Sequence, residues 1–330
     1  TINAMAWSPS AEMLVDPFGG RRDLAAHIVR CVGEPERRFS EDALRIMRAL
    51  RFSAQLGFAL EEKTAQALVA SVSLLDAIAV ERVAAELLLL VSAPHAAAVI
   101  RTYWDIIAHV VPELAPMKGF EQHNPHHPHD VAEHTLVALD STPSYDPCVR
   151  MALLFHDCGK PDTFHLDETG GHFYGHPARS AEITQEALER LRYPRAFSDE
   201  VVKLVGRHDA PIMPETKNIK RWMNRLGHDS FYRLLDVKRG DVAGLCADDQ
   251  PVLALFDEIE AIARRIDDER ACFSLKDLAV DGTDIIALGV APGPEVGQLL
   301  GEALDAVIDE RIPNEKDALL GFLRTDIDTR

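Results

Sequence analysis

Four charged residues recur every third position in this 330-residue chain: Asp42, Arg45, Arg48 and Arg51. Adenine and cytosine both present an exocyclic amino donor beside a ring-nitrogen acceptor. A carboxylate can accept from the first and a guanidinium can donate to the second, so Asp42 and Arg45, one helical turn apart, could read that edge. The alternative is a solvated, ion-paired helix face, which is common on surface helices and contributes little to stability.

A second group combines histidines with carboxylates. His156 and Asp157 follow an apolar run, His134 lies upstream and Asp241 downstream. Imidazole and carboxylate together suit a divalent metal such as Mg²⁺, Mn²⁺, Fe²⁺, Co²⁺ or Ni²⁺. Asp157 could bridge two ions, and an ion that lowers the pKa of bound water would supply hydroxide for attack on phosphorus. A purely structural cluster is the alternative.

The arginine row needs a helix to position it, and the sequence predicts one over Ser40–Leu56. Ser40 is a good N-cap, because its side-chain oxygen can accept an unpaired N–H of the first turn. Glu41 and Asp42 then lie where the helix dipole favours negative charge. An apolar stripe at helical spacing completes the pattern, made of Leu44, Met47 and Leu50.

The rest of the chain predicts a mainly α-helical protein with one small β-hairpin. The hairpin is expected from Thr1–Trp7 and Glu12–Val15, followed by a glycine-rich turn at Asp16–Gly20. Further helices are expected at Glu61–Val72, Ala79–Val91 and His95–His109, with Gly57 at a helix C′ position. A helix through Arg270, a Gly-rich turn at Gly293–Gly297 and a closing helix to Ile308 complete the chain.

Charge and cysteine content restrict the class of protein. The net charge of −18 and the pI near 5.2 exclude a protein coated in basic surface, although a local basic strip can still bind RNA. The five scattered cysteines form no C-x-x-C pair and suit a reducing cytosol, and no signal peptide or membrane span is recognised. We therefore expect a cytoplasmic protein. Its local basic strip consists of Arg21, Arg22, Arg30, Arg37, Arg38, Arg45, Arg48 and Arg51.

The stretch Glu41-Asp-Ala-Leu-Arg45, followed by Arg48-Ala-Leu-Arg-Phe52, resembles the nucleotide-selecting motif of class II tRNA nucleotidyltransferases. These are the CCA-adding enzymes and their bacterial poly(A) polymerase relatives. The resemblance implies that Asp42 and Arg45 act as a protein template for ATP and CTP, with Arg48 near the triphosphate. It also implies tRNA as the partner.

Two neighbouring stretches resemble the same family. Val80–Glu86 resembles the next motif, whose Glu and Arg brace the base-reading helix; surface pairs on an amphipathic helix are the alternative. Asp16–Arg30 resembles a flexible element at the end of the catalytic head, and Arg30 is expected to bind nucleotide; a plain Gly-rich turn explains Asp16–Gly20 equally well. The Mg²⁺-binding Asp-x-Asp of that head would lie before Thr1. We therefore expect an N-terminally truncated enzyme that cannot add nucleotides by itself.

The order His134…His156-Asp157…Asp241 resembles the HD phosphohydrolase superfamily. The resemblance implies that His176 and His208 are additional metal ligands and that Asp157 and Lys160 are catalytic, with Lys160 neutralising a phosphate. The activities expected from HD-containing members are 2′,3′-cyclic phosphodiesterase, 2′-nucleotidase or phosphatase. Three further histidines are expected to line the entrance or bind surface metal: His126, His127 and His129.

These resemblances predict four regions. They are a remnant of the nucleotidyltransferase head at 1–36, a helical neck at 37–115, an HD domain at 116–250 and a helical, tRNA-binding tail at 251–330. In the tail, the turn at Gly293–Gly297 could contact RNA phosphate, or simply join two packed helices. The alternatives for the whole protein are a stand-alone metal-dependent phosphohydrolase and a non-catalytic RNA-binding scaffold. The shared motifs leave open whether C, A or both are added.

Overall fold

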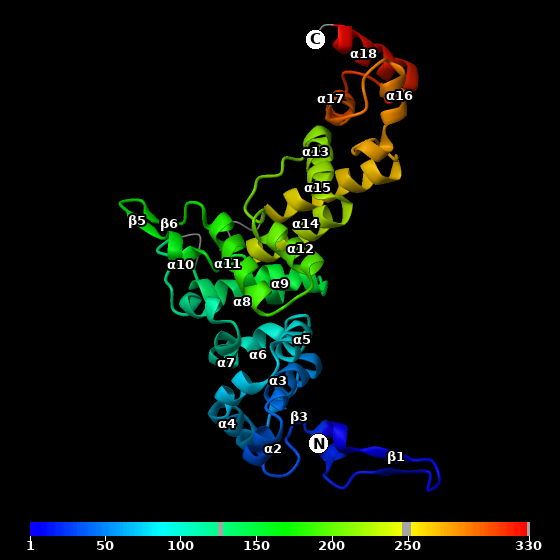
Figure 1. Ribbon diagram of the computed structural model, residues 1–330. Coiled ribbons are helices and arrows are strands. Elements are labelled where there is room, and N and C mark those ends of the chain that lie inside the picture. The colour runs from blue at the N-terminus through cyan, green and yellow to red at the C-terminus, as the bar shows by residue number, and fades with distance from the viewer. Residues whose placement is uncertain (125–127, 246–251, 329–330) are drawn as a thin grey trace. The chain divides into compact units, whose positions relative to one another are not determined.

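The computed structural model describes residues 1–124, 128–245 and 252–328, and it is mainly helical, as expected (Figure 1). It divides into two compact units. Unit 1 comprises the described residues of 1–209 and 236–250, and unit 2 those of 210–235 and 251–330. The functional boundaries expected at 36, 115 and 250 remain predictions.

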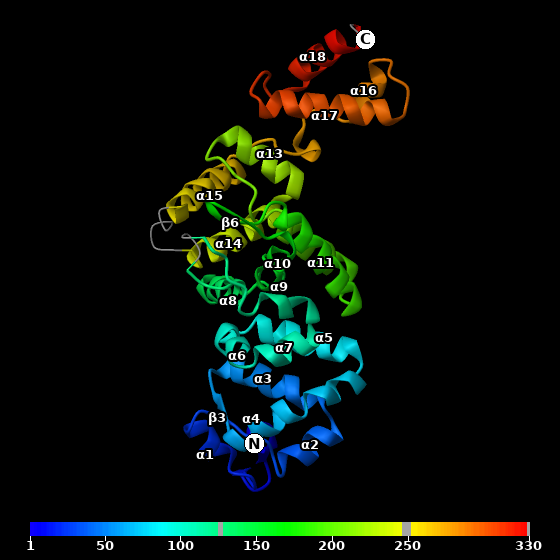
Figure 2. The same cartoon turned by 90° about the vertical axis from the view of Figure 1, so that its left-hand side faces the viewer.

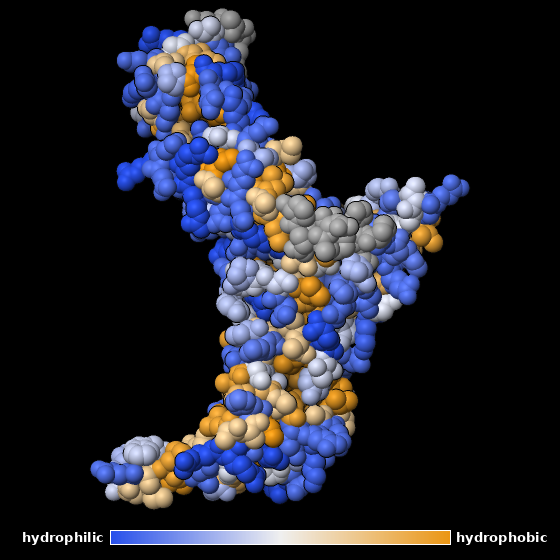
Figure 3. Space-filling view, turned by 180° about the vertical axis from the view of Figure 1, so that it is seen from behind, coloured by the Kyte–Doolittle hydropathy of each residue, from blue (hydrophilic) through white to orange (hydrophobic). Residues whose placement is uncertain are grey.

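The expected hairpin begins the chain. After η1 (Ile2–Ala4), β1 (Ala6–Ser8) pairs antiparallel with β2 (Met13–Val15). The carboxylate of Asp16 then accepts the backbone N–H groups at residues 20 and 21, at 2.7 and 2.9 Å, which caps α1 (Gly20–Ala25). The hairpin presents apolar surface (Figure 3). Its exposed apolar side chains, with one from the following turn, are Trp7, Met13, Leu14, Val15 and Phe18.

The predicted helix over Ser40–Leu56 is wrong in its first turn, because it is two helices, α2 (Pro35–Glu41) and α3 (Leu44–Leu56). Ser40 lies inside α2, where its hydroxyl donates to the carbonyl of residue 36 rather than capping a helix. Asp42 adopts an extended backbone, and its carboxylate accepts the N–H of Leu44 at 3.2 Å. This local hydrogen bond competes with the backbone hydrogen bonds of a helix and interrupts the helix there.

The other elements in this part of the chain agree more closely with those predicted from the sequence. Gly57 ends α3 in the left-handed conformation at φ 67°, and β3 (Ile28–Val29) pairs in parallel with β4 (Ala59–Leu60). Glu61 caps α4 (Glu62–Ala70) by accepting the N–H of Thr64. The remaining elements are η2 (Val72–Ala77) and α5 (Val80–Val91).

The single helix expected at His95–His109 is divided into α6 (Ala96–Thr102) and α7 (Trp104–Val110). The hydroxyl of Thr102 donates to the carbonyl of Ala98 at 2.9 Å, a bond that bends helices. Among the described residues no single helix is long and apolar enough to cross a membrane; α5 and α6 meet that test only together, across a bend of 120°.

The remainder of unit 1 is a second group of helices packed on the first, α5 against α9 and α6 against α8 (Figure 2). Aspartates at positions 130 and 146 cap α8 and α9 through their side chains. The elements are η3 (Pro112–Met117), α8 (Val131–Ser141), α9 (Pro147–Phe155), α10 (Lys160–Thr163), β5 (His165–Asp167), β6 (Gly170–His172), α11 (His176–Arg190), α12 (Arg195–Val205) and the second half of α14 (His228–Ala243).

Unit 2 contains the first half of α14 and the expected tail helices. Its elements are α13 (Thr216–Leu226), α15 (Val252–Asp268), η5 (Leu275–Asp277), α16 (Gly282–Ala287), α17 (Pro294–Ile308) and α18 (Lys316–Asp328). An apolar core joins the last three helices through Ile285, Leu299, Ala303, Leu319 and Leu323.

A buried arginine joins the two helical groups of unit 1. The Arg150 guanidinium donates to the carbonyl of Val91 at 2.9 Å, to that of Ala93 at 3.1 Å, and to that of Leu139. These carbonyls lie at the end of α5 and in the last turn of α8, where helical partners are missing. Since the side chain is buried, the carbonyl groups of Val91 and Leu139 depend on it for pairing, whereas that of Ala93 also accepts the N–H of Ala96 at 3.2 Å.

Replacing Arg150 by Met is therefore expected to destabilise unit 1 by about 3 kcal/mol, because each buried carbonyl left unpaired carries a desolvation cost. The measurement is the urea midpoint followed by circular dichroism. The matched control is Arg101→Met, which removes an exposed ion pair to Glu133 between α6 and α8 and should cost less than about 1 kcal/mol. Equal midpoints for the two variants would contradict the assignment.

Candidate functional site

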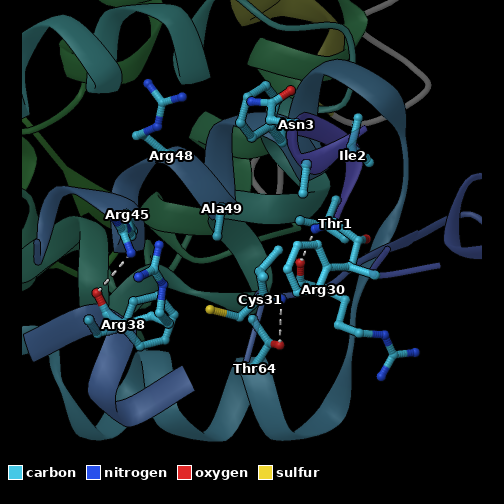
Figure 4. A pocket seen from close by; sticks show the side chains of 16 residues that line it. Thr1, Ile2, Asn3, Arg30, Cys31, Arg38, Arg45, Arg48, Ala49 and Thr64 are labelled. Carbon is cyan, nitrogen blue, oxygen red and sulfur yellow. Dashed lines mark hydrogen bonds between the residues drawn. The ribbon is translucent and has the colours of Figure 1, made fainter. Parts of the chain in front are cut away.

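A cavity of about 560 Å³ lies beside α2 and α3. Figure 4 shows Arg38, Arg45 and Arg48 along one side of it and Thr1, Ile2 and Asn3 along the other. Aromatic rings form the apolar part of its wall. The cavity therefore combines surfaces for stacking with guanidinium hydrogen-bond donors. Its aromatic residues are Phe18, Phe39 and Phe52.

Arg45 and Arg48, both predicted to bind nucleotide, line this cavity. Arg45 is 34% exposed, and its guanidinium lies 3.6 Å from the carboxylate of Glu41 and donates to the carbonyl of Arg38 at 3.5 Å. These partners hold the side chain in place while leaving other donors for a ligand. Arg38, which also pairs with Glu41, was not among the predicted site residues.

A buried carboxylate on α5 supports the arginine row. Glu86 is only 9% exposed, and its two oxygens lie 3.4 Å from the guanidinium of Arg48 and 3.1 Å from that of Arg51. Arg82, one turn earlier on α5, lies 3.6 Å from the carboxylate of Asp42. The Val80–Glu86 motif thus contacts the predicted reading residues directly, rather than forming pairs along its own helix.

Asp42 does not line the cavity, although Arg45 does. Its side chain is 33% exposed, one oxygen accepts the N–H of Leu44 and the other faces Arg82. The two residues are joined by the backbone bond from the N–H of Arg45 to the carbonyl of Asp42 at 3.2 Å. They are adjacent and accessible, but they lie on either side of a helix start rather than on one rigid helix.

Arg30 also lines the cavity, but its guanidinium is engaged by carboxylates. Its Nε lies 3.0 Å from Asp23 and one terminal nitrogen lies 3.2 Å from Glu61. Asp23 is buried, and although burial alone raises its pKa, hydrogen bonds from Thr1 and Arg30 lower the pKa below its usual range. Arg30 therefore fixes the wall of the cavity.

The six predicted metal ligands lie close together, with the carboxylate of Asp157 at their centre. Donor atoms of His134, His156, Asp157 and Asp241 lie within 4.8 Å of one another, and so do those of Asp157, His176 and His208. One Asp157 oxygen lies 3.4 and 3.3 Å from His134 and His156, and the other 3.5 and 3.7 Å from His176 and His208. The arrangement suits a carboxylate that bridges two ions.

Each of the four histidine rings uses Nδ1 to contact a backbone carbonyl, at 2.7 to 3.2 Å. A carbonyl only accepts, so Nδ1 carries a proton, and Nε2, which faces the carboxylates, is the atom that presents a lone pair to a metal when the ring is neutral. The Nε2 atoms of His134 and His156 lie 3.3 Å apart, and those of His176 and His208 lie 3.2 Å apart. Facing lone pairs at these distances repel unless a cation lies between them. Such carbonyl contacts are typical of metal-binding histidines.

The charged groups around Asp157 also indicate a metal site. Neither of its buried oxygens accepts a hydrogen bond among the described residues, although the Lys160 ammonium lies 2.8 Å from one of them. Lys160 also donates to the side chain of Gln122 at 2.8 Å. The residues therefore fit a divalent metal, and Lys160 contacts a predicted ligand rather than standing free beside the cavity.

The ionisation of the ligands fits metal binding. Burial alone raises the pKa of Asp157, but His156 and Lys160 outweigh it and hold the pKa well below its usual range. The pKa of Asp241 is lowered in the same way by His134 and His156. Burial lowers the pKa of His208, whereas Asp157 and Asp241 overcome burial and raise the pKa of His156 to about 10, so without an ion this ring holds a proton that a metal would displace. The carboxylates thus require a positive charge, which a cation can supply.

A cavity of about 480 Å³ opens onto these ligands, and several of its residues were not predicted. Gln122, which holds Lys160, lies a few residues before His126, His127 and His129, but nothing in its spacing marked its role. His126 and His127 lie outside the described residues. His129 is half-buried, and its carbonyl accepts the side chain of Gln122 at 3.1 Å. The unpredicted lining residues include Asn124, His172, Phe173 and Tyr174.

Two family models match the chain. One is described as "tRNA nucleotidyltransferase domain 2 putative" and matches residues 180–323. The other, "Probable RNA and SrmB- binding site of polymerase A", matches residues 57–118, which include α4 to α7.

Relatives of known function match over most of the chain. The A-adding tRNA nucleotidyltransferase of Deinococcus radiodurans is 32% identical, with 93% of this chain and 73% of the relative covered. The CC-adding tRNA nucleotidyltransferase of Thermus thermophilus is 31% identical, with 96% and 73% covered. The chain thus spans about three quarters of the length of these relatives.

Solved structures share the fold. The Bacillus stearothermophilus CCA-adding enzyme in complex with CTP superposes with a TM-score of 0.67 and 28% identity, covering 100% of this chain and 73% of that one. The Thermotoga maritima CCA-adding enzyme complexed with tRNA has a TM-score of 0.56 and 19% identity, covering 99% and 72%. At that identity the second similarity concerns the fold alone.

Replacing Asp157 by Asn is expected to lower the affinity for Mn²⁺ by more than about a hundredfold, since even partners outside the ligand set cost ten- to a hundredfold. The measurement is calorimetric titration together with bound metal per chain by mass spectrometry. Asp162→Asn, which alters an exposed carboxylate paired with Arg179, is the control and should retain the metal. Full metal content in the Asp157→Asn variant would contradict the bridging arrangement.

Proposed function

This chain belongs to the tRNA nucleotidyltransferase family, and we propose that two sites in its first unit serve nucleotide selection and phosphate chemistry. The family expectation from the sequence is thereby confirmed. For the functional regions we retain the predicted division into a neck at 37–115, a metal-binding HD domain at 116–250 and a tail at 251–330.

Nucleotide selection is assigned to the cavity beside α2 and α3. Arg45 offers guanidinium donors to the ring-nitrogen acceptor of adenine or cytosine, and the adjacent Asp42 is the candidate acceptor for the exocyclic amino group. Reading by Asp42 requires its carboxylate to turn from Arg82 towards the cavity. Its exposure and its place outside the helix support such a rotation. Arg48, held by Glu86, is available for the triphosphate.

ATP, CTP and tRNA are the proposed substrates. The relatives include A-adding, CC-adding and CCA-adding enzymes, and solved structures with a similar fold contain CTP or tRNA. We assign the acceptor end of the tRNA to the neck, whose residues 57–118 match a probable RNA-binding model, and Mg²⁺ to the transfer reaction. The expected turn at Gly293–Gly297 is the start of α17, and its contact with RNA phosphate remains a prediction.

The histidine–carboxylate cluster is proposed to bind a divalent metal such as Mn²⁺, Ni²⁺, Co²⁺ or Fe²⁺ and to hydrolyse a phosphoester. The single observation that carries this is the pair of close Nε2–Nε2 contacts, 3.3 and 3.2 Å, on either side of Asp157. A bound ion would lower the pKa of a water and supply hydroxide at neutral pH.

The chain's own residues would orient that reaction. Asp157 holds the two ligand groups at a fixed separation, and Lys160, kept in place by Gln122, contributes positive charge beside the phosphate. As the new bond from water oxygen to phosphorus forms, the ester P–O bond breaks and its oxygen leaves with a proton. The cluster is otherwise buried, so the reacting group enters through the adjoining cavity.

Replacing Arg45 by Ala, in a protein that joins this chain to an Asp-x-Asp catalytic head, is expected to lower kcat/KM for CTP and ATP by about tenfold or more, because a charge-assisted hydrogen bond to the base is lost. Discrimination against GTP and UTP should fall as well. The measurement is single-nucleotide incorporation into tRNA transcripts that lack A, CA or CCA.

The matched control is Arg37→Ala, because Arg37 is 83% exposed and pairs with Glu41 without lining the cavity. It should keep both the rate and the base preference. An Arg45 variant that retained the wild-type preference among the four nucleotides would remove the template role.

Hydrolysis by the metal cluster is tested with a nucleoside 2′,3′-cyclic phosphate and added Mn²⁺ or Ni²⁺. Asp157→Ala should reduce the rate by at least about a hundredfold through loss of the metal, whereas Asp162→Ala should leave it unchanged. Lack of hydrolysis by a wild-type protein that contains metal would limit the cluster to a structural role.

A further inference from the structure

The β5–β6 hairpin carries an aromatic pair to the metal cavity. His172 at the end of β6 and Tyr174 just after it line the same 480 Å³ cavity as Asp157 and Lys160. Their rings are parallel within 10°, with centroids 5.4 Å apart. Tyr174 nevertheless remains 75% exposed, so most of its ring surface is open to a ligand.

The ring of His172 is held by polar contacts within the hairpin. Its Nε2 lies 2.8 Å from the hydroxyl of Thr169 and 3.2 Å from the carboxylate of Asp167. The same carboxylate accepts the backbone N–H of Thr169 at 2.7 Å, which fixes the turn. The His172 ring therefore supports one face of the Tyr174 ring. No large rearrangement is needed for the other face of Tyr174 to contact a ligand.

The hairpin is also fixed relative to the metal ligands. The N–H of Gly171 donates to the carbonyl of His123 at 2.8 Å, and a Cβ at position 171 would lie only 2.1 Å from the carbonyl oxygen of Gln122. Only glycine allows this approach. The side chain of Gln122 holds Lys160, which in turn lies 2.8 Å from Asp157. The chain of contacts thus runs from the aromatic hairpin to the bridging carboxylate.

We propose that Tyr174, supported by His172, is the stacking platform for the base of a nucleoside phosphate whose phosphate is bound beside Asp157 and Lys160. The inference rests on the metal and phosphate chemistry proposed above and names its substrate class. An aromatic face recognises any base, and stacking contributes about 1–3 kcal/mol per base. The cavity volume lies within the range of small-ligand sites.

The test compares Tyr174→Ala with Tyr174→Phe, which keeps the ring and removes only the hydroxyl. The probe is 2-aminopurine riboside 5′-monophosphate with Mg²⁺, because its fluorescence is quenched when the base stacks. Wild type and the Phe variant should quench with the same Kd, and the Ala variant should raise the Kd about tenfold, in line with the loss of one stacking contact. Ribose 5-phosphate, which has no base, should bind all three proteins within about twofold in calorimetric titrations, because it makes no stacking contact.

Equal quenching Kd values for the Ala variant and wild type would overturn the platform. So would an Ala variant that loses ribose 5-phosphate affinity as strongly as it loses the aminopurine nucleotide, since Tyr174 would then support the cavity rather than the base. If ribose 5-phosphate failed to bind wild type at all, the phosphate function would fail, and the platform with it. If only the stacking proposal is wrong, ribose 5-phosphate still binds wild type. That result distinguishes failure of the stacking proposal from failure of the proposed phosphate site.

Discussion

The buried guanidinium of Arg150 is the interaction on which the first unit depends. It closes the carboxyl end of α5 and the last turn of α8 with a single side chain. The helix α5 carries the residues that support the nucleotide cavity, and α8 carries His134 of the metal cluster. A planar fork with five donors can satisfy three carbonyls at once, which the single ammonium of lysine would do with poorer geometry.

Buried carboxylates determine how both sites present charge. Glu86 lies behind Arg48 and Arg51, and Asp157 lies between the histidine pairs beside Lys160. Each carboxylate holds its neighbouring side chains from the buried side of the cavity. The solvent side of those side chains is left for a phosphate or a base. An acidic protein with net charge −18 can therefore offer a locally cationic cavity beside α2 and α3 to anionic substrates.

The helix break at Asp42 gives the candidate base reader properties that a continuous helix would not have. Arg45 belongs to the first turn of α3 and is positioned by its packing, whereas Asp42 precedes the helix and pairs with Arg82 on α5. Its carboxylate can change partner without disturbing the helix. One fixed donor and one adjustable acceptor would suit a site that accepted both ATP and CTP.

The sequence alone determined the helical class and the hairpin, and it singled out the candidate base-reading motif and the six histidine and carboxylate residues that the structure brings together. The first two follow from local periodicity and turn residues, whereas the candidate site residues follow from the tandem His156 and Asp157 and from resemblance to known motifs. It could not determine the helix break, because Ser40 satisfied the local rule for an N-cap while Asp42 bonded to Leu44 and Arg82. Nor could it find the contacts of Arg150 or Gln122. Those residues contact groups that folding brings together from distant parts of the chain, so only the tertiary structure decided what each one holds.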